Sequence, residues 1–382
     1  MNPILLLTLA VGLVGSNSLV LSPLAGEVAA SFAPRTPEEV MIASAIYGGG
    51  VAISALVLAP HADRVGLRNA LLWGLMVLTG AMGLSALAPT LVTLCLAQAV
   101  AGAAAGICLP ATYGLAAEIA PKGREAETLG KVIVGWTISM VAGVTLSALL
   151  ADLASWRVVF AVLAAFGVAA AWLLAKHTDA TRPTGASKPP PPWVTLRIPG
   201  VASGLVAVAM FMAAFYGVYA YLGTHLTQTL GMSTATVGLV TLSYGAGFGL
   251  AAPLDRVVDR LGAARMTPLV LGAVAVEYLL IAAMQSSALG LLITAFSWGI
   301  FQHLGLNLLI GRLAAIDPSR RAAIMGLNSS VTYGAMFLGT AGFKPVFLAW
   351  GHGGTATLAA LCLVAAIVVT LAALRPLQHP AQ

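Results

Sequence analysis

Residues 62–66 read ADRVG, and residues 258–262 read VDRLG, a separation of 196 residues. Three matches share nearly this register, the other two being YGGG at 47–50 with YGAG at 244–247 and AP at 120–121 with DP at 317–318, each separated by 197 residues. Self-similarity at one fixed period indicates a duplicated unit. Because each match lies at the same place in its half, the sequence predicts two structurally related halves of parallel topology.

Composition places both halves in a membrane. The 382 residues are 59% hydrophobic and only 8% charged, whereas soluble domains are about one quarter charged. A bilayer core about 30 Å thick requires roughly 20 apolar residues per helix. We therefore expect an all-α membrane protein with twelve transmembrane helices as two parallel six-helix repeats, at residues 4–25, 39–59, 69–88, 91–117, 129–151, 156–175, 199–222, 234–254, 267–285, 288–313, 322–343 and 354–374.

A polar, proline-rich segment separates the two sets of helices. It includes four consecutive prolines at 189–192, and such a stretch can neither span a bilayer nor build a core. The predicted organisation is an N-terminal six-helix bundle at 1–176, a cytoplasmic linker at 177–198 and a C-terminal six-helix bundle at 199–382. The first apolar run lacks the basic segment of a secretory signal, so we expect it to be a transmembrane helix.

The positions of lysine and arginine predict the orientation, because short cytoplasmic loops retain these residues. With both termini in the cytoplasm, only Arg35, Arg157 and Lys344 of the nineteen basic residues lie on the opposite side. A shift of one helix would remove this asymmetry. We expect a multi-pass protein of a bacterial inner membrane. The net charge of +6 is scattered over short loops, which favours the lipid bilayer and not nucleic acid as its partner.

Two motifs are similar to those of a known family. Residues 59–69, APHADRVGLRN, resemble the G-x-L-a-D-r-x-G-r-k loop between helices two and three of the major facilitator superfamily. The WRVVF sequence at 156–160 resembles the W-R-x-x-F that opens helix six in its drug and sugar efflux branches, which are proton antiporters. The resemblance implies a monomeric transporter that works by alternating access and needs no cofactor.

The resemblance also implies a gating role for the repeated loop. Charge pairs at the helix ends would close one state and be remade in the other as the halves rock. The alternative is a topological anchor that keeps the loop on the cytoplasmic side. The gating-loop residues are Asp63, Arg64, Gly66, Arg68, Asp259, Arg260 and Gly262.

Three positions depart from the proton antiporters of this family. Gln98 stands where they carry a helix-four arginine, Gly143 is followed by valine in place of proline, and Asn17 lies in a neutral polar cluster where many keep an acid. The usual proton machinery is therefore not predicted. Asn17 and Gln98 remain candidates for contact with the solute.

Glu277 and His303 are ionisable side chains that lie well inside predicted spans, where such groups are costly and usually functional. Glu277, in the middle of helix nine, is either a proton carrier or a protonated group bonded to a neighbouring helix. His303 shares a helix face with Asn307 and neighbours Gln302, so it either binds solute or protons or simply packs. Without a second ionisable ligand nearby, no metal site is expected.

Aromatic residues with hydroxyl groups suit a planar or amphipathic solute, although packing is the alternative. The candidates are Tyr216, Tyr219 and Tyr244, with Trp136 and Tyr333 as further candidates of the same kind.

Small residues recur at every fourth position of predicted helix five. A small face lets helix backbones approach closely, and it also permits sliding. The predicted helix-packing seam consists of Gly135, Ser139, Gly143 and Ser147.

The leading functional hypothesis is proton-coupled export of a small amphipathic solute, either a drug or a metabolite. Uptake of a neutral nutrient and solute sensing without transport are the alternatives. No HExxH, GxSxG or Walker P-loop sequence is present, so we expect no enzymatic activity.

Overall fold

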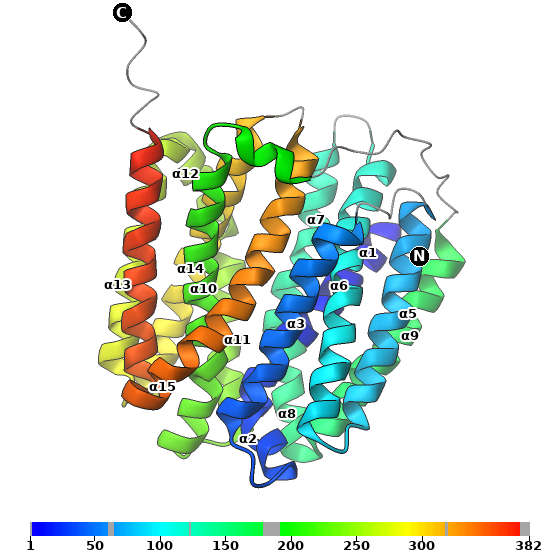
Figure 1. The fold of residues 1–382 in the computed structure, drawn as a ribbon, viewed down its shortest axis with the longest axis vertical. Helices are drawn as coiled ribbons and strands as arrows, with labels where there is room; N and C mark the ends of the chain where they lie inside the picture. Colours follow the sequence, from blue (N-terminus) through cyan, green and yellow to red (C-terminus); the bar gives the residue numbers. More distant parts are fainter. Residues whose placement is uncertain (1, 60–64, 122–123, 179–191, 318–319, 375–382) are drawn as a thin grey trace, which may run out of the picture. The chain divides into compact units, whose positions relative to one another are not determined.

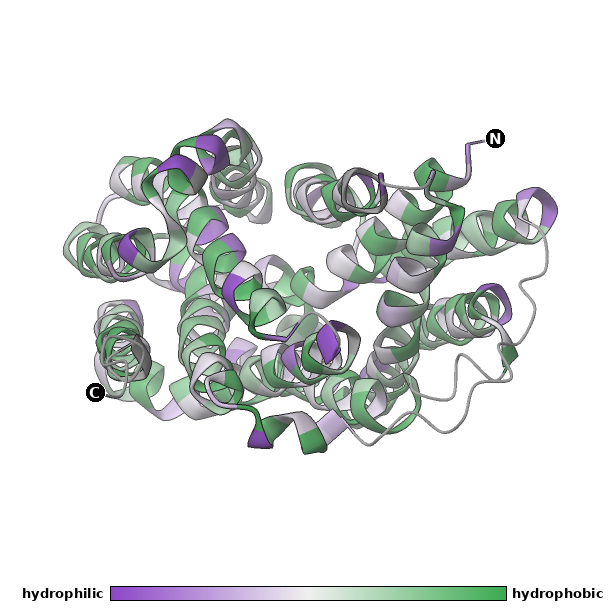
Figure 2. Ribbon diagram, turned by 90° about the horizontal axis from the view of Figure 1, so that it is seen from above, coloured by the Kyte–Doolittle hydropathy of each residue, from purple (hydrophilic) through white to green (hydrophobic). Residues whose placement is uncertain are grey.

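The computed structural model describes residues 2–59, 65–121, 124–178, 192–317 and 320–374, without the side chains of 125–127, 259, 322, 373 and 374. Within these ranges the chain is helical and contains no β-strand (Figure 1). Hydrophobic residues prevail along the helices in the end-on view of Figure 2, as expected for helices that face lipid and one another.

The first half of the chain forms these elements: α1 (Pro3–Leu19), α2 (Leu21–Ser31), α3 (Pro37–Val57), α5 (Leu67–Ala86), α6 (Leu91–Ile119), α7 (Glu125–Ile138), the π-helix η2 (Ser139–Val144), α8 (Thr145–Leu153) and α9 (Trp156–His177).

The second half forms these: η3 (Pro192–Arg197), α10 (Val201–Thr224), η4 (His225–Thr229), α11 (Thr234–Leu250), η5 (Ala252–Leu254), α12 (Asp255–Leu261), α13 (Ala263–Met284), α14 (Ala288–Ile316) and α15 (Arg321–Leu374).

The number of apolar helices agrees with the prediction. Ten helices are long and apolar enough to cross a membrane, and the bent pair α1 and α2 makes eleven. The helix α15 is interrupted at Gly351, which has φ 63° and ψ −162°. Counting the two arms of α15 separately gives twelve spans in the described chain, which confirms the predicted fold class.

Two predicted boundaries are wrong. The first helix does not end at residue 25; it bends by 51° between α1 and α2 and continues to Ser31. Pro23 lacks the amide hydrogen that would bond to the carbonyl of Leu19, so the helix is interrupted there. The predicted loop between residues 343 and 354 is also helical except at Gly351, where a positive φ favours glycine.

The chain forms two compact units. The first comprises Met1–Pro189 with Leu226–Leu242, and the second comprises Pro190–His225 with Ser243–Gln382. In the first unit, α6 packs against α3 and α5, and α1 packs against α7. In the second unit, α15 packs against α10 and α13, and α13 packs against α14.

The repeat in the sequence corresponds to a repeat in helix packing. A Cβ atom at Gly102 would meet the carbonyl oxygen of Tyr47 in the first unit, and one at Gly299 would meet the carbonyl oxygen of Tyr244 in the second. Gly102 and Gly299 are 197 residues apart, and so are Tyr47 and Tyr244. Each unit therefore contains the same close crossing of two helices, and only glycine leaves room for it.

The WRVVF segment joins three helices of the first unit at one end. The guanidinium of Arg157 donates to the carbonyl oxygens of Ala86 and Ala88 at 2.9 and 2.7 Å, which satisfies the C-terminal end of α5. The indole of Trp156 donates to the hydroxyl of Ser31 at 2.9 Å. The motif thus fixes the ends of α2, α5 and α9 within that unit.

Candidate functional site

Three polar side chains meet between α12 and α14 in the second unit. Nε2 of His303 lies 3.0 Å from Oδ2 of Asp255, and Nδ2 of Asn307 donates to the same oxygen at 3.1 Å. The side chains of His303 and Asp255 are 13% and 36% exposed. The sequence singled out His303 and Asn307 but not Asp255, which is the carboxylate that joins them. We call Asp255, His303 and Asn307 the polar cluster.

Local structure explains where Asp255 lies. The short helix η5 follows α11, and α12 begins directly at Asp255. A carboxylate in the first turn of a helix is stabilised by the free amides and the helix dipole. His303 and Asn307 lie one turn apart on α14, which brings both side chains to the same carboxylate.

The polar cluster has two arrangements for one proton. Nδ2 of Asn307 lies 2.9 Å from Nε2 of His303 as well as 3.1 Å from Asp255. When Nε2 carries a hydrogen, it donates to the carboxylate of Asp255; when the carboxyl carries the proton, Nε2 is free to accept from Asn307. A protonated Nε2 can thus donate to the carboxylate of Asp255, and an unprotonated Nε2 can accept either from the protonated carboxyl or from Asn307, while Nδ1 of His303 is buried without a described partner.

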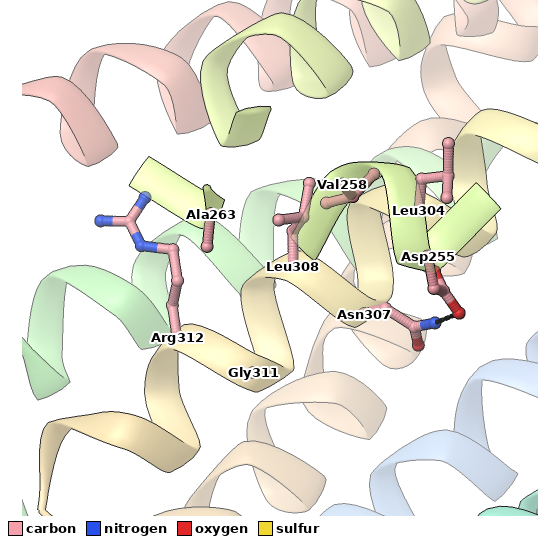
Figure 3. Close-up of a pocket in the computed structure, with 8 residues that line it drawn as sticks. All are labelled: Asp255, Val258, Ala263, Leu304, Asn307, Leu308, Gly311 and Arg312. Atoms are coloured by element: carbon pink, nitrogen blue, oxygen red, sulfur yellow. Dashed lines mark hydrogen bonds between the residues drawn. The ribbon is translucent and has the colours of Figure 1, made fainter. Parts of the chain in front are cut away.

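A pocket of about 280 Å³ lies next to the polar cluster. Figure 3 shows Asp255 and Asn307 at one end of the row of lining side chains and Arg312 at the other. Apolar and small residues form the wall between them: Val258, Ala263, Leu304, Leu308 and Gly311.

Three of the predicted aromatic residues, Tyr216, Tyr219 and Tyr244, belong to one packed array in the second unit, which we call the aromatic array. The ring of Phe215 lies 5.6 Å from those of both Tyr219 and Tyr244, and 5.0 Å from that of Tyr216. Trp298 of α14, which the sequence did not single out, lies 4.8 Å from Tyr244. Each of these side chains is almost fully buried, and the rings pack against one another.

The aromatic array reaches the polar cluster. Phe248 lies 6.2 Å from Tyr244 and 4.9 Å from the imidazole of His303, between ring centres. The buried hydroxyl of Tyr244 has no hydrogen-bond partner in the described chain. Phe248 therefore links the aromatic array, including this unpartnered hydroxyl, to the polar cluster.

Other predicted residues of the second unit lie apart from the polar cluster. The hydroxyl of Ser297 donates to the carboxyl of Glu277 at 3.1 Å, a contact that joins α14 to α13. Gln302 is 2% exposed and its Oε1 has no described hydrogen-bond partner. Tyr333 is buried on α15.

The predicted polar residues of the first unit form a neutral network. Nδ2 of Asn17 donates to Oε1 of Gln98 at 3.1 Å, and Nε2 of Gln98 donates to the hydroxyl of Ser85 at 3.0 Å. The indole of Trp136 separately donates to the hydroxyl of Tyr113 at 3.0 Å. These contacts link α1, α5, α6 and α7 without an ionisable group other than the phenol.

The gating loop is only partly described. Asp63, Arg64 and the side chain of Asp259 lie outside the described part of the structure. Arg68 donates from Nη2 to the carbonyl of Ala175 at 2.7 Å, so it caps the end of α9 within its own unit.

The glycines of the two loops share one backbone conformation. Gly66 has φ 85° and ψ 136°, and Gly262 has φ 87° and ψ 131°. Each precedes a helix, α5 or α13, and this backbone region is accessible to glycine and strained for other residues. Arg260, the described basic residue of the second loop motif, is exposed.

The small residues of the predicted seam lie along α7, η2 and α8. A Cβ atom at Gly135 would meet the carbonyl oxygen of Thr8, and one at Gly143 would meet the hydroxyl of Ser16. Ser139 begins the π-helical turn η2 and donates to the carbonyl of Trp136 at 2.7 Å. Ser147 is buried on α8. The predicted seam therefore packs closely against α1, and the π-helical turn η2 lies in its middle.

Two repeat-related units of apolar helices are the architecture of a polytopic membrane protein. Residues 5–340 match the model of the Major Facilitator Superfamily, and the chain belongs to this family of transporters.

Relatives span most of the chain. It is 27% identical over 379 residues to the uncharacterized MFS-type transporter YwfA of Bacillus subtilis (strain 168), covering 96% of this chain and 90% of YwfA. It is 25% identical over 263 residues to the chloramphenicol resistance protein of Streptomyces lividans, covering 68% and 67%. The crystal structure of the human organic anion transporter MFSD10 (TETRAN) has the same fold, with TM-score 0.71, 15% identity and coverage of 96% and 98%.

Proposed function

We propose that this protein is a secondary active transporter that exports a small amphipathic solute in exchange for protons. The observation that carries the proposal is the polar cluster, which is confined to one unit. Subtracting the repeat of 197 residues places Asp255, His303 and Asn307 opposite Leu58, Gly106 and Pro110 of the first unit. The two halves share the same close helix crossing, but the ionisable polar cluster is found in the second unit and not at the equivalent positions of the first.

The polar cluster has the properties that a proton carrier needs. An imidazole can take up and release a proton, and an ionisable group among transmembrane helices is costly unless it has a partner or a function. Asp255 is 36% exposed, so it can exchange protons with water, while His303 is mostly enclosed. Loading and release of one proton would change the charge beside the pocket in each transport cycle.

The surroundings of the polar cluster favour an amphipathic solute. The pocket wall is apolar between its two polar ends, and Phe248 connects the polar cluster to the aromatic array. Aromatic and aliphatic walls with a few polar groups are typical of sites for small organic molecules. The similarity to a chloramphenicol resistance protein supports export as the direction.

The remaining parts of the proposal concern the membrane. The distribution of lysine and arginine supports both termini in the cytoplasm, and the bacterial relatives support a bacterial inner membrane. A monomer suffices, because both repeat-related units are present in one chain. The gating loop and the small-residue seam would then serve the movement between states.

Flux measurements in sealed proteoliposomes test the proposal. The purified protein would be challenged with a panel of radiolabelled amphipathic drugs, with and without an imposed pH gradient. We expect the gradient to drive accumulation of at least one compound, and Asp255→Asn to abolish it. Glu277→Gln is the matched control, because it neutralises a buried carboxyl that lies apart from the polar cluster.

Each contrary outcome selects an alternative. Flux that does not depend on the pH gradient indicates a facilitative carrier. This outcome favours uptake of a neutral nutrient over proton-coupled export. Binding without flux for every compound indicates a sensor. Equal gradient-driven flux in Asp255→Asn and wild type rejects the polar cluster as the proton carrier.

A further inference from the structure

Arg312, at the end of the pocket opposite the polar cluster, has no ionic partner among the described residues. It lies near the C-terminal end of α14 with its side chain partly enclosed. Its Nη1 atom is buried and has no hydrogen-bond partner, and the described residues offer it no ion pair. Figure 3 shows its guanidinium group beside Ala263, beyond the apolar wall.

Other arginines near helix ends are satisfied by backbone oxygens. Arg68 and Arg157 donate to the carbonyls of Ala175 and Ala86, and Nε of Arg321 donates to the carbonyl of Ala314 at 3.0 Å. Each of these three therefore has a structural function. Arg312 has no such acceptor, although burying an unpaired guanidinium group is unfavourable.

A guanidinium group is best satisfied by an anion with two oxygen atoms. It presents its donors as a planar fork that matches carboxylate, sulfonate and phosphate oxygens. The adjoining wall of Val258, Leu304 and Leu308 is apolar and can hold the body of a molecule that carries such a group. The equivalent position in the first unit is Leu115, so the arginine is confined to the unit that contains the pocket.

We propose that the pocket binds an amphipathic anion, whose charged group pairs with Arg312 and whose apolar body lies along α14 toward Asn307. Binding of an anion in this pocket does not depend on the proposed function. Only the role of that anion as the transported solute rests on it. The same chemistry has a second source, the headgroup of an anionic phospholipid, since basic pockets between membrane helices bind such headgroups.

Binding in nanodiscs tests the proposal without requiring transport. The full-length protein in phosphatidylcholine nanodiscs would be titrated with dansylglycine and, as the uncharged match, with dansylglycinamide. The variants are Arg312→Gln, Arg312→Lys and Leu308→Trp, which fills the pocket and keeps the arginine. The control is Arg197→Gln, an exposed arginine on η3.

We expect wild type and Arg197→Gln to bind dansylglycine equally. Arg312→Gln should raise its Kd by about tenfold or more, as expected for loss of a charge-assisted contact. Arg312→Lys should restore part of the affinity, and Leu308→Trp should weaken binding of the carboxylate. The amide should bind weakly to every variant, and thermal unfolding of each variant checks its fold.

A second titration in nanodiscs that contain phosphatidylglycerol distinguishes the two sources. If this lipid competes with dansylglycine in wild type but has no effect in Arg312→Gln, the anion is a lipid headgroup. If it does not compete, the anion is a solute. If the carboxylate and the amide bind alike, or if folded Arg312→Gln and Leu308→Trp both bind dansylglycine as wild type does, the proposal is overturned, and the transport proposal remains to be decided by flux.

Discussion

The two units share a helix scaffold and differ in what they enclose. In the first, the hydroxyl of Tyr47 donates to the carbonyl of Val14 at 3.4 Å; in the second, the hydroxyl of the repeat-related Tyr244 has no described partner. The first unit contains the neutral network of Asn17, Gln98 and Ser85. The second contains the polar cluster and Arg312, which has no ionic partner among the described residues.

This difference indicates that the shared helix crossings serve stability, whereas the ionisable groups of the second unit serve function. Shared glycine crossings preserve the geometry of both repeats, since a side chain at either crossing would strike backbone. Buried neutral groups that bond to one another, as Asn17, Gln98 and Ser85 do, favour a single packing. Ionisable groups that are half exposed or unpaired are unfavourable for stability and are therefore expected to serve the solute and the coupling ion.

The largest expected effect concerns the polar cluster. His303→Gln removes the group that shares a proton with Asp255, so we expect accumulation driven by a pH gradient to be abolished. The matched change in the first unit is Gln98→Leu, which should reduce stability and leave the dependence on the gradient intact. Flux in proteoliposomes at several pH values measures both; loss of gradient dependence in Gln98→Leu would remove the contrast between the units.

The second prediction concerns the shared scaffold. Gly102→Ala and Gly299→Ala each place a methyl group against a tyrosine carbonyl, and overpacking of this kind costs about 1–3 kcal/mol or more. The two variants should lower the thermal unfolding temperature by similar amounts. A loss confined to one variant would show that the two crossings are not equivalent.

The third prediction concerns the neutral network. Gln98→Leu leaves Nδ2 of Asn17 without its acceptor, whereas Ser85 keeps its bond to the carbonyl of Ala81, and an unsatisfied buried polar group costs about 1–3 kcal/mol. Unfolding should occur at a lower temperature than in wild type. The double variant Asn17→Leu with Gln98→Leu should recover part of the loss, and an unchanged unfolding temperature in the single variant would contradict the network.

The smallest effect is expected at Glu277. Glu277→Gln keeps the hydrogen bond from Ser297 and lies apart from the polar cluster, so gradient-driven flux should remain near the wild-type level. Initial rates at saturating solute provide the measurement. A loss as complete as that of His303→Gln would move the proton carrier from α14 to α13.

Much of the fold was predictable because its signals are local or periodic. Apolar length located the spans, and the repeat in the loops agrees with the backbone conformation that Gly66 and Gly262 share. Local signals failed where the chain departs from a simple span. Pro23 lies inside an apolar run that continues through its bend, and the loop expected after residue 343 is helical up to Gly351.

The candidate site was predictable only in part. His303 and Asn307 were found because polar residues at helical spacing are conspicuous in an apolar span. Asp255 was missed because it lies among the charges of a loop, and only the turn of η5 brings it to α14. Trp298 resembled any apolar residue, and the sequence could not show that Arg312 has no partner.

The most direct test of the central claim is proton movement that accompanies the solute. Proteoliposomes with an enclosed pH-sensitive dye would be mixed with a transported compound in the absence of any gradient. We expect the internal pH to change with wild type and with Glu277→Gln, and not with Asp255→Asn or His303→Gln. An equal pH change in all four proteins would contradict the assignment of coupling to the second unit.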